Sequence, residues 1–134
     1  MSRSIPVACL LTLLVAALLQ PAAADPATHA GGDAARGQAL YQARCTACHS
    51  VDYPGVGPAH RGVFGRRAGT SKGFDRYSTA LKASGLVWTE LNLDRWLTDP
   101  EKLVPGQAMG ISVPDAGERA DLIAYLRTLK AVKE

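Results

Sequence analysis

The sequence predicts an all-α domain in which a few short helices are joined by long loops. Two observations support this fold class: apolar residues recur at helical spacing in several segments, and no segment alternates apolar and polar residues as a strand does. The chain has 134 residues, the length of a single domain, and a formal net charge of +3. This nearly balanced charge indicates neither nucleic acid nor an anionic membrane surface as a partner.

The first 24 residues have the pattern of a secretory signal peptide. Arg3 precedes an apolar run over residues 7–19, and the small residues Ala22 to Ala24 precede the expected cleavage site. The run is shorter than the roughly 20 apolar residues that a membrane span needs, so a retained anchor is the less favoured alternative. We therefore expect a bacterial protein exported to the periplasm, with residues 25–32 as a loose leader and residues 33–134 as the domain.

The first helix of the domain is predicted over residues 34–43. Asp33 can cap this helix, because its carboxylate accepts hydrogen bonds from the free amides of the first turn. The apolar residues Ala35, Ala39, Leu40 and Ala43 recur at helical spacing. A cysteine motif follows directly at the end of this helix.

Three further helices are predicted downstream. A short one is expected over residues 78–84, and a longer one over residues 90–98, capped by Thr89 and ended by Asp99-Pro100. The last covers residues 116–132, with leucine and isoleucine on one face and basic residues towards its end. The apolar residues of that face are Leu122, Ile123, Leu126 and Leu129.

Two loops rich in glycine and proline separate these helices, over residues 51–73 and 103–115. The first contains six glycines and two prolines, which is too many for a long regular element. Loops of this length are unusual in a compact domain unless they wrap around something. A large buried cofactor would also compensate for the small core of a domain of this size.

The motif Cys-Thr-Ala-Cys-His at residues 45–49 has three interpretations. A zinc site needs four ligands, but beside the motif the exported chain offers only His29 and His60. A redox dithiol of the thioredoxin kind needs a βαβ context, which the sequence does not predict. In an exported chain the pattern favours a covalently bound c-type haem, with thioethers from Cys45 and Cys48 and with His49 as an iron ligand.

The sixth iron position decides between functions, because an open site favours gas binding and a protein ligand favours electron transfer. Met109 is the only methionine after the predicted signal peptide, and it lies in a loop between Pro105 and Pro114. A methionine often only fills a gap in a core. Here it lies away from the helical apolar stripes, and a thioether is a soft metal ligand. We predict Met109 as the sixth ligand, with His29 and His60 as rivals.

These motifs together resemble class I cytochrome c, the family of small monohaem electron carriers. The resemblance covers residues 32–130 and is carried by GDAARGQALYQARCTACHSV, GVGPAHRGVFGRRAGT, PEKLVPGQAMG and ERADLIAYLRTLK. It implies the cytochrome c fold, in which the N- and C-terminal helices cross and long loops surround one covalently bound haem c. Gly37 and Tyr41 would then contact Leu122 and Tyr125 at the crossing.

The resemblance also implies roles for residues around the haem. The carbonyl of Pro58 would accept a hydrogen bond from the ring of His49, which orients a metal ligand. Arg66, Tyr77 and Trp88 match residues that hydrogen-bond the haem propionates. Three positions depart from the family pattern: Trp96 replaces a tyrosine near the methionine, Ile111 replaces an aromatic residue, and His60 stands where an apolar residue is common.

The function that follows is that of a soluble, monomeric one-electron carrier with His49 and Met109 as axial ligands, and not an enzyme. Its partners would be redox proteins, either membrane complexes or periplasmic dehydrogenases, with no stable membrane insertion after signal removal. The positions matching the lysine ring of mitochondrial members include Arg44, Glu101 and Asp115, so docking should depend weakly on salt. The alternative is a peroxidase-like or gas-binding haem protein from which Met109 dissociates.

Overall fold

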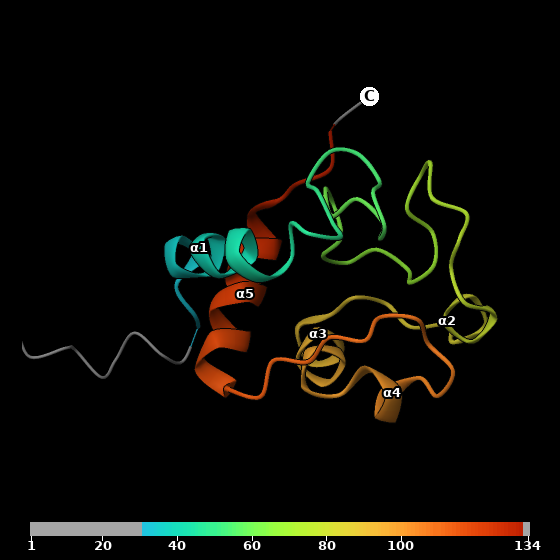
Figure 1. The fold of residues 1–134 in the computed structure, drawn as a ribbon. Helices are drawn as coiled ribbons and strands as arrows, with labels where there is room; N and C mark the ends of the chain where they lie inside the picture. The colour runs from blue at the N-terminus through green and yellow to red at the C-terminus, as the bar shows by residue number, and fades with distance from the viewer. Residues whose placement is uncertain (1–30, 133–134) are drawn as a thin grey trace, which may run out of the picture.

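The computed structural model describes residues 31–132, and this part of the chain contains five helices (Figure 1). They are α1 (Ala34–Arg44), α2 (Thr79–Ala83), α3 (Glu90–Thr98), α4 (Pro100–Leu103) and α5 (Ala116–Thr128). No strand is present in these residues, and a single antiparallel bridge joins Arg67 and Val87. The predicted all-α class is therefore confirmed. The predicted signal peptide and most of the leader lie outside the described residues.

The predicted helices are present, and their N-terminal caps explain where they begin. The carboxylate of Asp33 accepts hydrogen bonds from two amides of the first turn of α1, and the hydroxyls of Ser78 and Thr89 cap α2 and α3 in the same way. The helix α4 was not predicted. Asp99 directly follows α3, and its side chain caps a further short helix that begins at Pro100.

The helix α5 is shorter at its C-terminus than the sequence predicts. It ends at Thr128, because Leu129 leaves the helical conformation, with φ −76° and ψ 67°. The carbonyl of Leu129 accepts a hydrogen bond from the amide of Gly62 instead. The last residues of the chain are thus attached to the long loop that follows the cysteine motif.

The helices α1 and α5 cross in close contact (Figure 1). A Cβ atom added to Gly37 would lie 1.9 Å from the backbone oxygen of Asp121, so no other residue allows this approach. The ring centroids of Tyr41 and Tyr125 are 5.2 Å apart at the same crossing. The close contact expected from the resemblance is present, with the backbone of Asp121 as the nearest neighbour of Gly37.

A buried carboxylate fastens this crossing. Asp121 of α5 is 7% exposed, and it accepts a hydrogen bond of 2.6 Å from the amide of Asp33. It also accepts from the Arg36 guanidinium, with 2.8 Å between Nε and Oδ2. The start of α1 is therefore held on α5 by a charge-assisted pair in addition to apolar packing.

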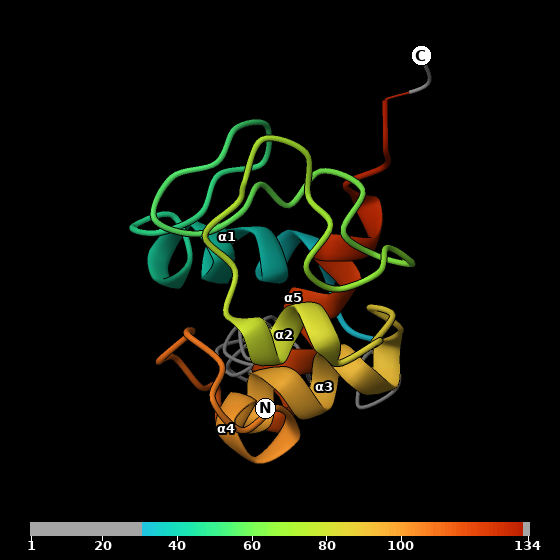
Figure 2. The ribbon, with the colours of Figure 1, turned by 90° about the vertical axis from the view of Figure 1, so that its right-hand side faces the viewer.

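The rest of the chain forms two halves beside the crossed helices (Figures 1 and 2). The long loops over residues 50–77 form the upper half of Figure 1, and α2, α3 and α4 form the lower half together with the segment that carries Met109. The core draws on both halves and on the crossed helices, and α3 and α5 contribute Leu93, Trp96, Leu122, Ile123 and Leu126 to it. Its most buried members are Tyr41, Ala68, Val113, Leu122 and Ile123.

Candidate functional site

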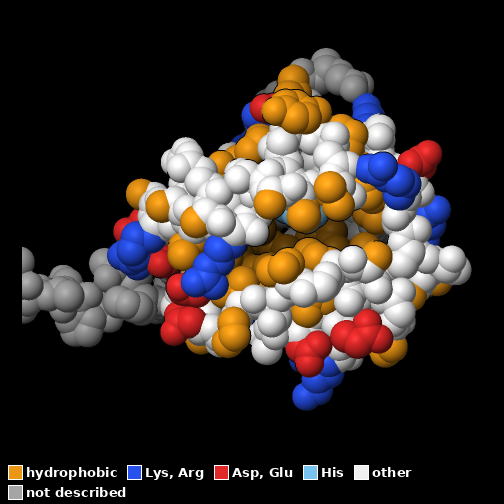
Figure 3. Space-filling view, viewed as in Figure 1, with side chains coloured by type: hydrophobic (Ala, Val, Ile, Leu, Met, Phe, Trp, Pro, Cys, Tyr) orange, Lys and Arg blue, Asp and Glu red, His pale blue; other side chains and the backbone are white. Residues whose placement is uncertain are grey.

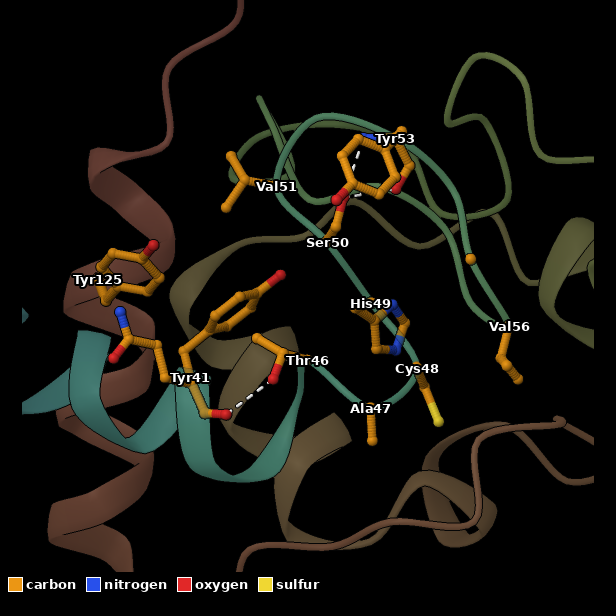
Figure 4. Close-up of a pocket in the computed structure, with 12 residues that line it drawn as sticks. Tyr41, Thr46, Ala47, Cys48, His49, Ser50, Val51, Tyr53, Val56 and Tyr125 are labelled. Carbon is orange, nitrogen blue, oxygen red and sulfur yellow. Dashed lines mark hydrogen bonds between the residues drawn. The ribbon is translucent and has the colours of Figure 1, made fainter.

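The cysteine motif continues the direction of α1 as one further turn. The amide of His49 donates to the carbonyl of Cys45 over 2.8 Å, and the amide of Cys48 donates to the same oxygen. Cys45 is half-buried against the core, whereas Cys48 is exposed, and no disulfide joins them. In Figure 4 the Cys48 side chain points away from the neighbouring loop, towards the lower half of the molecule. One short turn thus presents two thiols and an imidazole together.

The imidazole of His49 is fixed at one nitrogen. Its Nδ1 lies 2.8 Å from the carbonyl oxygen of Pro58, and because a carbonyl only accepts, Nδ1 carries the proton. The other nitrogen, Nε2, then has its lone pair available for a metal. Burial lowers the pKa of His49, although the bond to Pro58 opposes this. The ring is therefore neutral at pH 7, as a metal ligand must be.

A glycine makes room for this ring. A Cβ atom added to Gly57 would lie 2.2 Å from Cε1 and 2.6 Å from Nδ1 of His49. The loop that supplies the Pro58 carbonyl therefore runs directly against the edge of the imidazole. The amide of Gly57 in turn donates to the carbonyl of Cys48 over 2.8 Å, which closes the loop on the motif.

A second imidazole lies flat against the first. The ring centroids of His49 and His60 are 4.2 Å apart with an interplanar angle of 22°. A hydrogen bond of 3.1 Å joins Nδ1 of His60 to the hydroxyl of Tyr41. Burial, together with the neighbouring His49 and Arg66, lowers the pKa of His60 to about 3. Both imidazoles thus lie on one side of the site, which argues against His60 as the ligand opposite His49.

The residues expected around the propionates lie close together. The guanidinium of Arg66 donates to the carbonyl oxygens of Ala59 and Arg61, over 3.0 and 2.8 Å. The hydroxyl of Ser71 donates to the same oxygen of Ala59, and the amide of Ser71 donates to the hydroxyl of Tyr77. Burial lowers the pKa of Arg66. These contacts form one partly buried polar cluster, in which Ser71 is a buried member that the sequence did not indicate.

Trp88 is buried beside this cluster. Its amide donates to the carbonyl of Arg66 over 2.9 Å, and its ring packs edge-on against Trp96 with 5.2 Å between centroids. Trp88 is 8% exposed and Trp96 is 7% exposed. The tryptophan pair therefore joins the polar cluster to α3.

Met109 comes from the opposite half of the molecule and is half-buried against the core. Its amide donates to the side-chain oxygen of Gln107. The carboxylate of Glu101 accepts from the amide of Gly106 over 2.9 Å and from the Gln107 side chain over 3.2 Å. Beyond Met109 the chain is open to solvent, and Ile111 is 53% exposed.

The far end of this segment is held by a buried arginine. Arg119 of α5 is 9% exposed, and its NH1 atom donates to the carbonyls of Val113 and Pro114 over 3.0 and 2.7 Å. Its Nε donates to the carboxylate of Asp94 over 2.7 Å. Arg119 therefore connects the segment carrying Met109 to both α5 and α3. No sequence pattern indicated this role.

A hollow lies between the two halves and is visible in Figure 3. Hydrophobic side chains line this central hollow, and histidine atoms lie at its upper edge. A separate pocket beside the motif includes Cys48, His49, Tyr41 and Tyr125 in its lining (Figure 4). An apolar hollow between the half that carries the cysteine motif and the half that carries Met109 fits a large apolar metal cofactor such as haem. It does not fit zinc, because no three His, Cys, Asp or Glu side chains converge within residues 31–132.

Comparison with known proteins decides the family. The family model described as cytochrome c matches residues 34–130. The chain belongs to the cytochrome c family. It therefore carries one covalently attached haem c, with Cys45 and Cys48 at the spacing that attaches it, and the prediction of a one-electron carrier with redox partners is confirmed. Within residues 31–132, no helix has the length and apolar content to cross a bilayer.

Individual relatives agree with this assignment to the cytochrome c family. Cytochrome c2 of Rhodomicrobium vannielii is 41% identical over 75% of this chain and 82% of its own length. Cytochrome c 2.1 of Caenorhabditis elegans is 44% identical over 75% of this chain and 92% of its own. The solved structure of cytochrome cH from Methylobacterium extorquens has a TM-score of 0.69 and 45% identity, over 72% of this chain and 99% of that one.

Proposed function

We propose that the protein is a periplasmic electron carrier in which His49 and Met109 ligate the haem iron, and Cys45 and Cys48 attach the porphyrin. The observation that carries the proposal is the hydrogen bond from His49 Nδ1 to the Pro58 carbonyl, which leaves the lone pair of Nε2 available at a partly buried site. When bound, the haem supplies a one-electron couple, whose ferrous state is favoured by histidine and methionine ligation. The chain itself orients the ligands and excludes water.

Arg66, Tyr77 and Trp88 are proposed to bind the propionates. Arg66 has five N–H donors, and the two carbonyls it contacts leave donors available for an anion. The Tyr77 oxygen accepts from the amide of Ser71, so its own proton is free to be donated to a carboxylate. A partly buried guanidinium beside these donors would balance the charge of a propionate there.

The docking surface is proposed to be apolar and nearly neutral. Ile111 and Val56 are 53% and 72% exposed, while the Glu101 carboxylate is used within the chain by Gly106 and Gln107. Partners are proposed to be membrane complexes or periplasmic dehydrogenases, and no catalytic step is assigned to the protein. Electron-transfer rates with the native partner are expected to change little with added salt, and a steep decrease would contradict this docking mode.

The ligand assignment is tested on the protein matured in a host that attaches haem c. The oxidised protein should show the weak near-infrared band of sulfur-to-iron charge transfer, and a pyridine haemochrome spectrum should show the covalent haem. Met109→Leu conserves side-chain volume but removes the sulfur, so the band should disappear. Leu103→Met, a change of similar size in the half-buried α4, should keep it. A band that persists in Met109→Leu would refute the assignment.

The alternative is a gas-binding or peroxidase-like haem protein from which Met109 dissociates. The exposure of Ile111 next to Gly110 is the feature that favours it. Carbon monoxide distinguishes the two, since it binds ferrous haem only when the sixth position opens. Rapid binding to the reduced protein at neutral pH would support the alternative, whereas slow or absent binding supports the carrier.

A further inference from the structure

His60 and Tyr41 form a buried pair that the proposed electron-carrier function leaves unexplained. Their side chains are hydrogen-bonded over 3.1 Å, and the ring of His60 lies on the face of His49 with 4.2 Å between centroids. We propose that His60, held in place by Tyr41, is a positioning residue that fixes the orientation of the His49 imidazole plane. The proposal rests on the proposed function, in which His49 is an iron ligand.

The other contacts of His49 leave the tilt of its ring plane only loosely constrained. The hydrogen bond to the Pro58 carbonyl holds Nδ1, but a hydrogen bond tolerates a range of angles, so small coupled changes of χ1 and χ2 can still tilt the plane. Gly57 limits movement at the Cε1 edge. The χ2 torsion of a histidine is broad, so such edge contacts do not select a single plane. A flat neighbour on the ring face supplies the missing constraint, and His60 is that neighbour.

Tyr41 in turn fixes His60. Tyr41 is 2% exposed, and its ring is packed against Tyr125 with 5.2 Å between centroids, so its hydroxyl has a defined position. The hydrogen bond from this hydroxyl to Nδ1 selects one orientation of the His60 ring. The backbone of His60 is held as well, because its amide donates to the carbonyl of Ser50 over 3.0 Å. The constraint therefore passes from α1 through two side chains to His49.

Tyr41 and His60 satisfy each other's buried hydrogen-bonding groups. A buried hydroxyl or imidazole without a hydrogen-bond partner is destabilising, and each of these two residues supplies the partner that the other needs. Replacing both by apolar residues of similar size would avoid this cost. Stability alone therefore does not require a polar pair here. Its distinctive property is direction, because a hydrogen bond orients the stacked ring and an apolar contact does not.

The test uses the oxidised, haem-containing protein and its proton NMR spectrum. The shifts of the four haem methyl groups depend on the orientation of the axial imidazole plane. Tyr41→Phe and His60→Leu should each change the pattern of these shifts. In the double variant, Tyr41→Phe should add no further change to that of His60→Leu, because Tyr41 acts only through His60. Tyr125→Phe, which removes a hydroxyl from the neighbouring ring, is the control and should keep the parent pattern.

Two results would overturn the proposal. The first is a Tyr41→Phe variant whose haem methyl shifts equal those of the parent protein. The second is a Tyr41→Phe substitution that changes the shifts equally in the parent protein and in His60→Leu. A purely structural pair would change the free energy of unfolding in urea but not the methyl shifts. If His60→Leu yields too little protein, His60→Val provides the second background, and Tyr41→Phe is informative by itself. The near-infrared band is recorded on every sample. Its absence from the parent protein refutes the proposed function, whereas its presence with unchanged shifts refutes only the positioning role.

Discussion

Residues 49–66 and residues 104–115 lie on opposite sides of the central hollow, and they are held in different ways (Figures 1 and 3). The first, the histidine segment, makes hydrogen bonds along its whole length. The amides of Gly57 and His60 donate to the carbonyls of Cys48 and Ser50, and Arg66 binds two carbonyls of the same segment. The His49 ring has a neighbour at its nitrogen, its edge and its face.

The second, the methionine segment, is held mainly near its two ends. Glu101 binds the residues just before Met109, and Arg119 binds the carbonyls of Val113 and Pro114. Residues 110–112, which follow Met109, are all exposed. Segments with few buried contacts open at a lower free energy than the global unfolding of a protein. The iron–sulfur bond should therefore be the weaker of the two axial bonds, and the methionine segment the first to open.

The largest effect is expected from crowding the histidine segment. In Gly57→Ala the new methyl group would lie 2.2 Å from Cε1 of His49, so the ring must move away from the Pro58 carbonyl. Little haem-containing protein should accumulate, as measured by pyridine haemochrome per milligram of exported protein. Gly110→Ala is the matched change in the methionine segment, where a Cβ meets no atom within 4 Å, and it should mature normally. Equal haem content in both variants would contradict the comparison.

Local sequence patterns predicted those features of the fold that depend on neighbouring residues, such as the positions of helices. The caps at Asp33 and Thr89 and the periodic apolar residues fixed the positions of α1 and α3, and the resemblance indicated the contact of Gly37 with α5. The helix α4 was missed because four residues are too few to show a helical period. The end of α5 was placed too late because Leu129 leaves the helix and its carbonyl accepts a hydrogen bond from Gly62, in a loop far away in the sequence.

Polar contacts between distant parts of the chain could not be predicted in this way. Asp121 and Arg119 lie on an amphipathic helix, where charged residues are expected on the solvent side. Their partners, such as Arg36 and Asp94, are 85 and 25 residues away, and no pattern in the sequence joins them. Each of these ion pairs has only one buried partner, and the pair of Arg119 shows why the anchoring of the methionine segment emerged only from the structure.

A smaller effect is expected from removing the arginine that anchors the methionine segment. Arg119→Met keeps the apolar stem but leaves the carbonyls of Val113 and Pro114 without a donor, which should lower the free energy of unfolding by about 2–4 kcal/mol. In this variant the near-infrared band should disappear at a lower urea concentration than the one at which the domain unfolds around the covalent haem. Arg127 also lies on α5 and forms an exposed ion pair with Glu90 of α3. Arg127→Met should lower the free energy of unfolding by less than about 1 kcal/mol. Similar losses in both variants would show that Arg119 is not a special anchor.

The smallest effect should come from the other end of the same segment. Glu101→Ala removes two exposed acceptors, those of the Gly106 amide and the Gln107 side chain, which are together worth about 0.5–1 kcal/mol. The global free energy of unfolding should hardly change, because the histidine segment is untouched. Displacement of Met109 by added imidazole should become about two- to fivefold more favourable, since each 1.4 kcal/mol corresponds to about tenfold in an equilibrium constant. Lys102→Ala, at the neighbouring exposed position, is the control. If both variants bind imidazole like the parent protein, Glu101 does not restrain the segment, and the opening of residues 104–115 is governed by Arg119 alone.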